Sequence, residues 1–378
     1  MVFLRKIFGP FLGISFGITL LLTSVFGNFL LTLLLPVLYF NHKQWRSMVD
    51  RAISFWIIIP IVYLEYIFGV KFKAVGDAID NNRPAIIVMN HRTRLDWMYF
   101  WGVLFKMNPW LLVSSKIALK AELRNIPAAG FGMESNQYIF LDRKIEIDKE
   151  RITDAVHYYA TIGTDYQILL FPEGTDKTAD TTFKSNEYAK KNGLKELNYL
   201  IYPRSSGLIH LINEMRRYNY IESIYDVTLA YPVNVVQSEI GLLLLGQAPE
   251  QVLFHIKRID ISSVPRNDQD IANWINKLWL AKEEELSLFY SQRSPSTNFS
   301  NTENKFIWEK DNKTVKAVKI FTLCMWLSST PLWLYHLTFV RLVQVIYAVF
   351  FAVYVYIHFK YGGMQKMVYT KWRHSVTT

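Results

Sequence analysis

The sequence predicts an α/β domain with a largely parallel β-sheet, flanked by membrane helices at both ends of the chain. Long apolar stretches lie near both termini, and short apolar runs alternate with amphipathic stretches between them. Polar motifs directly follow two of the short apolar runs. Strands that alternate with helices favour a parallel sheet, and ligands collect at the carboxyl ends of such strands.

The composition favours a membrane-associated protein. Hydrophobic residues make up 51% of the 378 residues and aromatic residues 15%, whereas the mean hydropathy is only +0.10. A water-facing domain joined to a few apolar segments gives such a mixture. The net charge of +10 suits an anionic membrane surface, and no nucleic-acid-binding motif accompanies it. The single cysteine, Cys324, excludes an intrachain disulfide and zinc sites built on cysteine pairs.

The N-terminal region, residues 1–71, is predicted to anchor the chain in a membrane. Residues 11–40 carry no charge, and about 20 apolar residues suffice to span a bilayer. A second apolar block, residues 52–70, contains Pro60 and Glu65 and has basic residues on both sides. Such flanks argue against a simple span. It therefore stays open whether one of the two blocks is re-entrant or lies in the interface.

Residues 72–294 are predicted to form the α/β domain. We expect strands at residues 85–89, 110–113, 138–141, 167–171 and 224–231, and an exposed edge strand at residues 252–259. We expect helices at residues 95–105, 148–161, 205–217 and 268–290.

The C-terminal region, residues 317–378, is predicted to be a transmembrane hairpin with a basic tail. A linker, residues 295–316, separates it from the domain. Apolar runs at residues 317–339 and 342–359 are preceded and followed by lysines, and only Arg341 lies between them. This charge asymmetry predicts a hairpin whose two outer ends face the cytosol.

The main chemical signal is the run NHRTRLD at residues 90–96, which lies between a predicted strand and a predicted helix. On one continuous helix His91 and Asp96 would be about 140° apart, at ~100° per residue, and could not meet. A strand-to-helix turn can bring them together. Asp96 would then fix the imidazole tautomer, while the other ring nitrogen takes a proton from a hydroxyl. Taken alone, this spacing arises more often from a capping or core histidine and a surface aspartate.

A second signal makes chance an inadequate explanation. The run FPEGT at residues 171–175 also follows an apolar strand. Gly174 allows close approach of the backbone, while Glu173 offers an acceptor and Thr175 a hydroxyl. Two such motifs at the ends of parallel strands, in a chain with membrane anchors, indicate a catalytic site rather than two unrelated turns.

On these two motifs the sequence resembles the glycerolipid acyltransferase family, which acylates glycerophosphates and lysophospholipids. Two further blocks match, Gly130 through FLDR at residues 140–143 and YPR at residues 202–204. The resemblance implies a glycerophosphate-acyltransferase-like fold, His91 and Asp96 as catalytic residues, acyl-CoA as co-substrate, and no cofactor or metal. It also implies a substrate-binding set, in which the arginine holds substrate phosphate: Arg143, Glu173, Gly174, Thr175, Asp176 and Pro203.

The resemblance narrows to the lysocardiolipin acyltransferase branch. It rests on the runs NHRTRLDWM, FPEGTD, NGL, PRSSG and DVTLAYP, which begin at residues 90, 171, 192, 203 and 226. It implies an endoplasmic reticulum membrane protein with several spans and a cytosolic catalytic domain. The implied acceptors are lysophospholipids such as lysophosphatidylinositol and lysocardiolipin.

Asp176 departs from the wider family, because lysophosphatidic acid acyltransferases commonly have arginine there. An aspartate would repel a dianionic phosphate monoester, which favours a phosphodiester headgroup. Alternatively, Asp176 caps the next helix and faces away from the site. Four basic residues are candidates for CoA or lipid phosphates, and each is equally well explained as a solvated surface charge: Arg92, Arg94, Lys116 and Lys120.

Other functions remain open at this point. One is a lysophosphatidic acid acyltransferase, which headgroup competition would distinguish. Another is a metal-dependent hydrolase with His91, Asp96 and Glu173 as ligands, which a chelator would inactivate. A third is a non-catalytic membrane scaffold, although neither motif is degraded.

Overall fold

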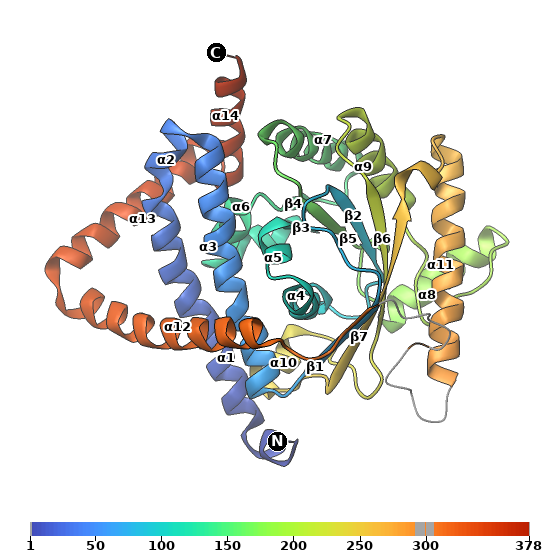
Figure 1. Ribbon diagram of the computed structural model, residues 1–378, viewed down its shortest axis with the longest axis horizontal. Coiled ribbons are helices and arrows are strands. Elements are labelled where there is room, and N and C mark those ends of the chain that lie inside the picture. Colours follow the sequence, from blue (N-terminus) through green and yellow to red (C-terminus); the bar gives the residue numbers. More distant parts are fainter. Residues whose placement is uncertain (1, 292–298, 300–305, 378) are drawn as a thin grey trace.

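An eight-stranded sheet forms the centre of the protein in the computed structural model, which describes residues 2–291, 299 and 306–377 (Figure 1). The strand order is β4-β3-β5-β2-β6-β7-β1-β8. The strands are β1 (Lys71–Gly76), β2 (Ala85–Met89), β3 (Ser115–Lys120), β4 (Ile139–Leu141), β5 (Gln167–Leu170), β6 (Ser223–Ala230), β7 (Gln251–Asp260) and β8 (Phe306–Trp308).

The five strands from β4 to β6 are parallel neighbours, which confirms the predicted α/β fold. Their carboxyl ends therefore share one edge of the sheet. All residues of β2 and β5 are buried, as expected for parallel strands that are covered on both faces. Strands β6 and β7 pair antiparallel, and β7 runs parallel to β1.

The prediction of an exposed edge strand at residues 252–259 is wrong. Strand β7 pairs with β6 on one side and β1 on the other, and its residues 252–256 are buried. Only its end, which includes Lys257 and Arg258, is exposed. Polar residues at the end of a long strand imitate the alternation of an edge strand, although the first half of β7 is central.

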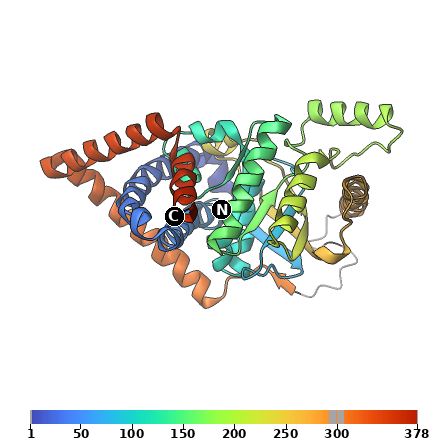
Figure 2. The same cartoon turned by 90° about the horizontal axis from the view of Figure 1, so that it is seen from above.

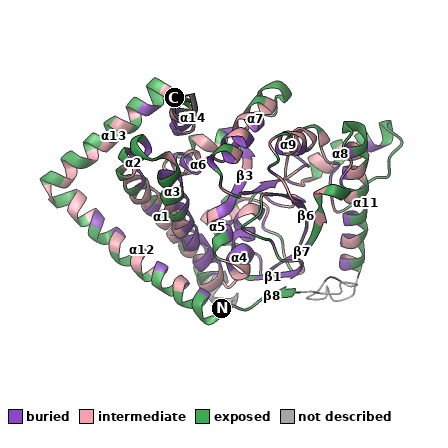
Figure 3. Cartoon of the chain, turned by 45° about the horizontal axis from the view of Figure 1, so that its top comes forward, coloured by how far each residue is buried: buried purple, intermediate pink, exposed green. Residues whose placement is uncertain are grey.

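The helices occupy both faces of the sheet. In Figures 1 and 3, α4 and α5 lie between the sheet and α3, and α11 lies on the opposite side. The helices are α1 (Val2–Leu33), α2 (Leu35–Phe40), α3 (His42–Val62), α4 (Asp96–Met107), α5 (Trp110–Ser114), α6 (Ala129–Ser135), α7 (Ile145–Ile162), α8 (Ala179–Lys191), α9 (Ser205–Arg217), α10 (Glu239–Leu245), α11 (Asp268–Ser291), α12 (Lys313–Phe339), α13 (Arg341–Tyr361) and α14 (Met364–Thr377).

The helices predicted around residues 95–105, 148–161, 205–217 and 268–290 are confirmed as α4, α7, α9 and α11. The strand predicted at residues 110–113 is wrong, because these residues form α5 and the strand β3 follows it. Pro109 occupies the N-cap position with a helical φ of −53°, and the Asn108 side chain accepts from the Trp110 amide. These local contacts start a helix in a run too short to show a helical period.

The predicted linker, residues 295–316, falls partly outside the described residues, which include 299 and 306–316 of this range. Its described part is ordered structure: β8 pairs antiparallel with β1, and α12 begins at Lys313 with Asn312 as its N-cap. The Asn312 side chain accepts from the Val315 amide at 2.8 Å. The described end of this segment therefore completes the sheet and starts the C-terminal helices.

Four helical segments of the described chain are long and apolar enough to cross a membrane, which is the pattern of a membrane protein. They are Phe8–Phe40, His42–Ile67, Lys313–Phe339 and Arg341–Tyr361. Helices α12 and α13 project from the body as a V whose tip points away from it (Figures 2 and 3). Both helices expose apolar side chains along most of their length. An exposed apolar helix of this length requires lipid around it.

The segment that contains α3 differs from the other three, because 56% of its most apolar stretch is buried inside the protein. The corresponding share in the other three segments is 6–28%. The Asp50 carboxylate of α3 is buried and accepts hydrogen bonds from Arg46 at 2.6 Å, Lys116 at 2.7 Å and Tyr166 at 2.7 Å. Lys116 lies on β3, and Tyr166 directly precedes β5. A buried ionic cluster therefore joins α3 to the sheet.

A second ionic cluster holds α12. Lys319 of α12 contacts Glu65 and lies 2.8 Å from Asp311. Lys106 of α4 contacts the same two carboxylates, at 2.6 Å and 3.2 Å. Two positive and two negative charges therefore balance where α12 meets α4 and the short helical turn Tyr63–Ile67. Removing one member of such a cluster would leave a largely buried charge without its partner, which destabilises the folded protein.

We expect Asp50→Ala to destabilise the protein by about 3–5 kcal/mol, because it leaves Arg46 and Lys116 as buried cations without a carboxylate. Thermal and denaturant unfolding of the detergent-purified protein, followed by tryptophan fluorescence, would measure the change. Lys43→Ala, which removes an exposed charge from the same helix, is the matched control and should change little. Equal unfolding midpoints for the two variants would show that the cluster does not hold α3 to the sheet.

Candidate active site

His91 and Asp96 meet at the junction between β2 and α4. The strand ends at Met89 and the helix begins at Asp96, so the chain reverses between them. His91 Nδ1 lies 3.0 Å from Asp96 Oδ2. The predicted encounter of the two side chains across a strand-to-helix turn is confirmed.

The Asp96 carboxylate is completely buried and surrounded by hydrogen-bond donors. Besides His91, the backbone amides of Arg92 and Thr93 donate to Oδ2, at 2.6 Å and 2.9 Å. The hydroxyls of Thr93 and Tyr231 donate to Oδ1, at 2.8 Å and 2.6 Å. Thr93 and Tyr231 were not identified from sequence as site residues, although Tyr231 lies in the run DVTLAYP. Five donors compensate the cost of burying this charge.

The surroundings of Asp96 determine the tautomer of His91. Because Asp96 is an acceptor, Nδ1 carries the proton and Nε2 keeps a lone pair. The ring stacks on Phe171, with 4.2 Å between ring centroids, and its side chain is 16% exposed toward a cavity. No hydrogen bond to Nε2 occurs within the described part of the chain. Nε2 is therefore free to accept a proton from a substrate in that cavity.

The second motif, FPEGT, follows the neighbouring strand β5 and contacts His91 through Phe171. Strand β5 pairs with β2, so residues 171–175 leave the same sheet edge as His91. Gly174 has φ +72° and its amide donates to the Phe171 carbonyl at 3.0 Å, closing a tight turn. Glycine adopts this left-handed conformation without steric cost. Gly174, Thr175 and Asp176 all line the cavity, as expected for substrate-binding positions.

Glu173 does not line the cavity, so its assignment to substrate binding is corrected. Its side chain is buried and accepts from the Trp279 indole of α11 at 3.2 Å. Burial raises the pKa of the Glu173 carboxyl well above its usual range. Glu173 points away from the cavity toward α11. A pentapeptide motif does not show which way each of its side chains points.

The cavity has a volume of about 1100 Å³ and extends from His91 to the membrane helices. Apolar side chains from α1, α3, α4 and α12 line one part of it, including Leu20, Ile53, Trp101 and Trp326. Basic side chains line another part: Arg94, Lys120, Arg143, Lys149 and Arg204. The same cavity therefore contains His91, an apolar compartment formed by these helix side chains, and this set of basic side chains.

The predicted phosphate ligand Arg143 lies where the cavity meets solvent. Its side chain is exposed, and it has a positive φ of 62° at the second position after β4. Pro203 does not line the cavity, whereas its neighbour Arg204 does. The Arg204 amide donates to the Pro172 carbonyl at 2.7 Å, so this segment braces the FPEGT turn. Arg204 lies in the same YPR run but was not identified from sequence as a site residue.

Asp176 faces the cavity and does not cap the following helix. Thr178 is the N-cap of α8 and forms a capping box with Thr181. Asp176 Oδ2 accepts from Gln237 Nε2 at 3.0 Å and lies 3.9 Å from Arg94 Nε. The alternative interpretation of Asp176 as a helix cap is therefore wrong.

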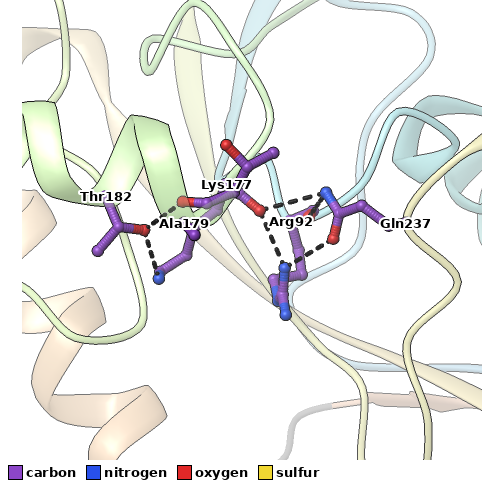
Figure 4. Close-up of a pocket in the computed structure, with 6 residues that line it drawn as sticks. Arg92, Lys177, Ala179, Thr182 and Gln237 are labelled. Carbon is purple, nitrogen blue, oxygen red and sulfur yellow. Dashed lines mark hydrogen bonds between the residues drawn. The ribbon is translucent and has the colours of Figure 1, made fainter.

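The candidate phosphate ligands separate into three groups. Arg94 and Lys120 line the large cavity. Arg92 lies in a smaller neighbouring pocket, shown in Figure 4. Lys116 is fully buried, and its ammonium donates to Asp50 and Asn136 at 2.7 Å and 2.8 Å. The interpretation of Lys116 as a CoA ligand is wrong, because its charge is used to hold α3 on the sheet.

The metal-dependent alternative has little support in the geometry. In the described part of the chain, no group of three or more His, Cys, Asp or Glu side chains could hold a metal ion. Asp96 is already surrounded by donors, and the Glu173 carboxyl lies outside the cavity. His91, Asp96 and Glu173 therefore do not form a common ligand set.

Comparison with known proteins finds relatives that span nearly the whole chain. The chain is 47% identical to lysophosphatidylinositol acyltransferase 10 of Caenorhabditis elegans, over 97% of this chain and 95% of that protein. It is 37% identical to lysocardiolipin acyltransferase 1 of Gallus gallus, over 83% of this chain and 82% of that protein. The solved structure of a 1-acyl-sn-glycerophosphate acyltransferase from Thermotoga maritima covers 75% of this chain and 98% of that one, with 16% identity and a TM-score of 0.46.

Two family descriptions match successive parts of the chain. Residues 71–232 match the Acyltransferase family and residues 242–326 match the Acyltransferase C-terminus family. The first range contains His91, Asp96 and the FPEGT turn, and the second contains α11 and the start of α12. The resemblance noted from the motifs is confirmed, and the chain belongs to the acyltransferase family.

Proposed function

We propose that the protein transfers a fatty acyl group from acyl-CoA to a hydroxyl of a lysophospholipid, of the lysophosphatidylinositol or lysocardiolipin type. The observation that carries this proposal is the position of His91. Asp96 orients its imidazole, and its free Nε2 faces a cavity that joins basic side chains to the apolar surfaces of membrane helices. The two long relatives, named for these two lysophospholipids, support the choice of acceptor.

The reaction requires one general base. His91 Nε2 accepts the proton of the acceptor hydroxyl while its oxygen attacks the thioester carbonyl carbon. When the tetrahedral intermediate collapses, the carbon–sulfur bond breaks and the imidazolium returns the proton to the CoA thiolate. The charge of Asp96 stabilises the imidazolium without itself taking the proton. The amides of Leu95, Asp96 and Met98 at the start of α4 already donate to Thr93 or Leu95. We therefore expect the amide of Trp97, a residue that lines the cavity, to stabilise the oxyanion.

This chemistry involves no cofactor and no metal, because the acceptor hydroxyl, the thioester and the histidine supply every atom that is exchanged. The apolar compartment of the cavity suits hydrocarbon chains, and Arg143, Lys149 and Arg204 suit a lipid phosphate. Acyl-CoA is water-soluble at its nucleotide end, whereas the acceptor is a membrane lipid. A site between a water-facing sheet and membrane helices can receive both.

We further propose that the protein resides in the endoplasmic reticulum membrane with its catalytic domain in the cytosol. The lysine-rich segments that flank the α12–α13 hairpin support this orientation. The turn between α12 and α13, around Val340 and Arg341, then lies on the lumenal side.

His91→Ala should lower kcat by about 10²–10⁴-fold or more, because the general base is lost. Asp96→Asn should also lower kcat severely, because the NH₂ group of the new side chain would face hydrogen-bond donors and find no acceptor. Transfer of labelled acyl groups by purified variants would measure both effects. His336→Ala, a histidine of α12 that does not line the cavity, is the control. Near-normal turnover of His91→Ala would end the proposed mechanism.

The topology proposal predicts that Asn312, in the sequon Asn-Lys-Thr, carries no glycan. The same holds for the sequon at Asn298, which lies outside the described residues. Glycosidase treatment of the expressed protein should leave its mobility unchanged. A long loop containing a sequon, inserted between Phe339 and Arg341, should be glycosylated as the positive control. A glycan on the unaltered protein that disappears in Asn312→Gln would contradict the proposed topology, because it would place Asn312 in the lumen.

The headgroup proposal predicts that Asp176→Arg raises activity on lysophosphatidic acid relative to lysophosphatidylinositol and lysocardiolipin. Two like charges at ~4 Å repel by about 4 kcal/mol at an effective dielectric near 20, and ~1.4 kcal/mol is already tenfold. The measurement is the ratio of kcat/KM for the three acceptors. Asp180→Arg, an exposed aspartate of α8 outside the cavity, is the matched control.

An unchanged ratio in Asp176→Arg would show that this side chain does not select the headgroup. Unaltered protein that prefers lysophosphatidic acid would favour the second candidate, a lysophosphatidic acid acyltransferase. Arg143→Ala should lower activity on all three acceptors, because each contains a phosphate.

A further inference from the structure

The small pocket beside the active site contains two cations in a polar lining. It has a volume of about 460 Å³ and is lined by Arg92, Lys177, Thr178, Ala179, Thr182 and Gln237. Figure 4 shows the Arg92 guanidinium and the Lys177 ammonium on the same side of the Lys177 main chain. The guanidinium, the ammonium, the hydroxyls and the amide of this lining can all donate hydrogen bonds to an anion.

Neither cation is paired with a carboxylate within the described residues. Arg92 Nη1 donates to the Lys177 carbonyl and to Gln237 Oε1, both at 3.0 Å. Lys177 Nζ donates to the Thr182 hydroxyl at 2.9 Å. All three acceptors are neutral. Burial and the nearby charge of Arg92 lower the pKa of Lys177, and the charges of Glu283 and Glu173 oppose this shift.

The carboxylates around the pocket are engaged elsewhere. Glu283 accepts from the backbone amides of residues 198–200. The Glu173 carboxyl is buried against Trp279, and its raised pKa favours the neutral form. Asp176 is held by Gln237 Nε2, which separates it from Arg92. None of these carboxylates forms an ion pair with Arg92 or Lys177 in the described part of the chain, and Glu283 and Glu173 act on Lys177 only through space.

The amino end of α8 adds to this positive potential. Thr178 is its N-cap, and both Thr178 and Ala179 line the pocket. The first amides of a helix carry partial positive charge and favour an anion. Asp180 lies in the same turn but is not part of the lining.

The pocket lies directly against the catalytic segment. Arg92 follows His91 in the chain, and the Lys177 amide donates to the His91 carbonyl at 2.9 Å. His91 itself lines the large cavity and not this pocket. The two volumes therefore lie beside one catalytic segment, and the large cavity already contains basic residues that suit a lipid phosphate.

We propose that this pocket binds the phosphate groups of the acyl donor's CoA nucleotide, with Lys177 and Arg92 as ligands. The inference rests on the proposed function and names a subsite for one of its two substrates. The lipid acceptor occupies the large cavity, where its hydrocarbon chain contacts apolar helices. The flexible pantetheine arm of the donor connects the pocket to the thioester at His91.

The test compares Lys177→Gln with Lys184→Gln, an exposed lysine of α8 that does not line the pocket. Lys177→Gln should raise the KM for acyl-CoA about tenfold, equivalent to ~1.4 kcal/mol. Its kcat and its KM for lysophosphatidylinositol should change little. Lys177→Arg should retain most of the affinity, because it keeps the charge. Lys184→Gln should behave as the unaltered protein.

A second donor identifies which group occupies the pocket. Acyl-pantetheine has the same thioester but no phosphate, so Lys177→Gln and the unaltered protein should use it equally. An increase in the KM for lysophosphatidylinositol instead would assign the pocket to the lipid phosphate and overturn the proposal. Equal effects on both donors, or no effect on either, would also overturn it. If the unaltered protein transfers from neither thioester, the proposed function itself fails.

Discussion

The buried carboxylate of Asp96 is the interaction on which the active site depends. A charge removed from water must be matched by donors, and this one has five. Two are backbone amides of the turn after β2, so the turn folds around the carboxylate. A third is Tyr231, at the end of β6, which connects the turn to the next strand. The same charge leaves His91 with one possible tautomer and a free Nε2.

The order of the sheet turns this local arrangement into a site. Strands β5, β2 and β6 are neighbours, so their carboxyl ends bring residues 171–175, His91 and Tyr231 to one edge. Strands β3 and β4 continue the row and place Lys120 and Arg143 farther along the cavity. The groups that line the cavity therefore follow the order of the strands, because consecutive strand ends present consecutive side chains.

Charge also determines how the membrane helices attach. Apolar contact alone would not distinguish a neighbouring helix from lipid, since both are hydrocarbon. The Asp50 cluster fixes α3 to β3, and the cluster of Glu65, Lys106, Asp311 and Lys319 fixes α12 to α4. Both helices line the cavity. The ionic clusters therefore set the position of the apolar compartment relative to His91.

Several features of this protein follow from patterns of neighbouring residues. These are the α/β pattern, the apolar helices at both ends, and the two motifs that follow β2 and β5, because periodicity and strand-to-helix junctions are local. The directions of the charged side chains and the identity of the central strands depend instead on the whole fold. Lys116 is buried against Asp50, 66 positions away in sequence, Glu173 contacts Trp279, and β7 lies inside the sheet. Burial of a charge depends on a partner that is distant in sequence, and no local pattern of residues identifies that partner.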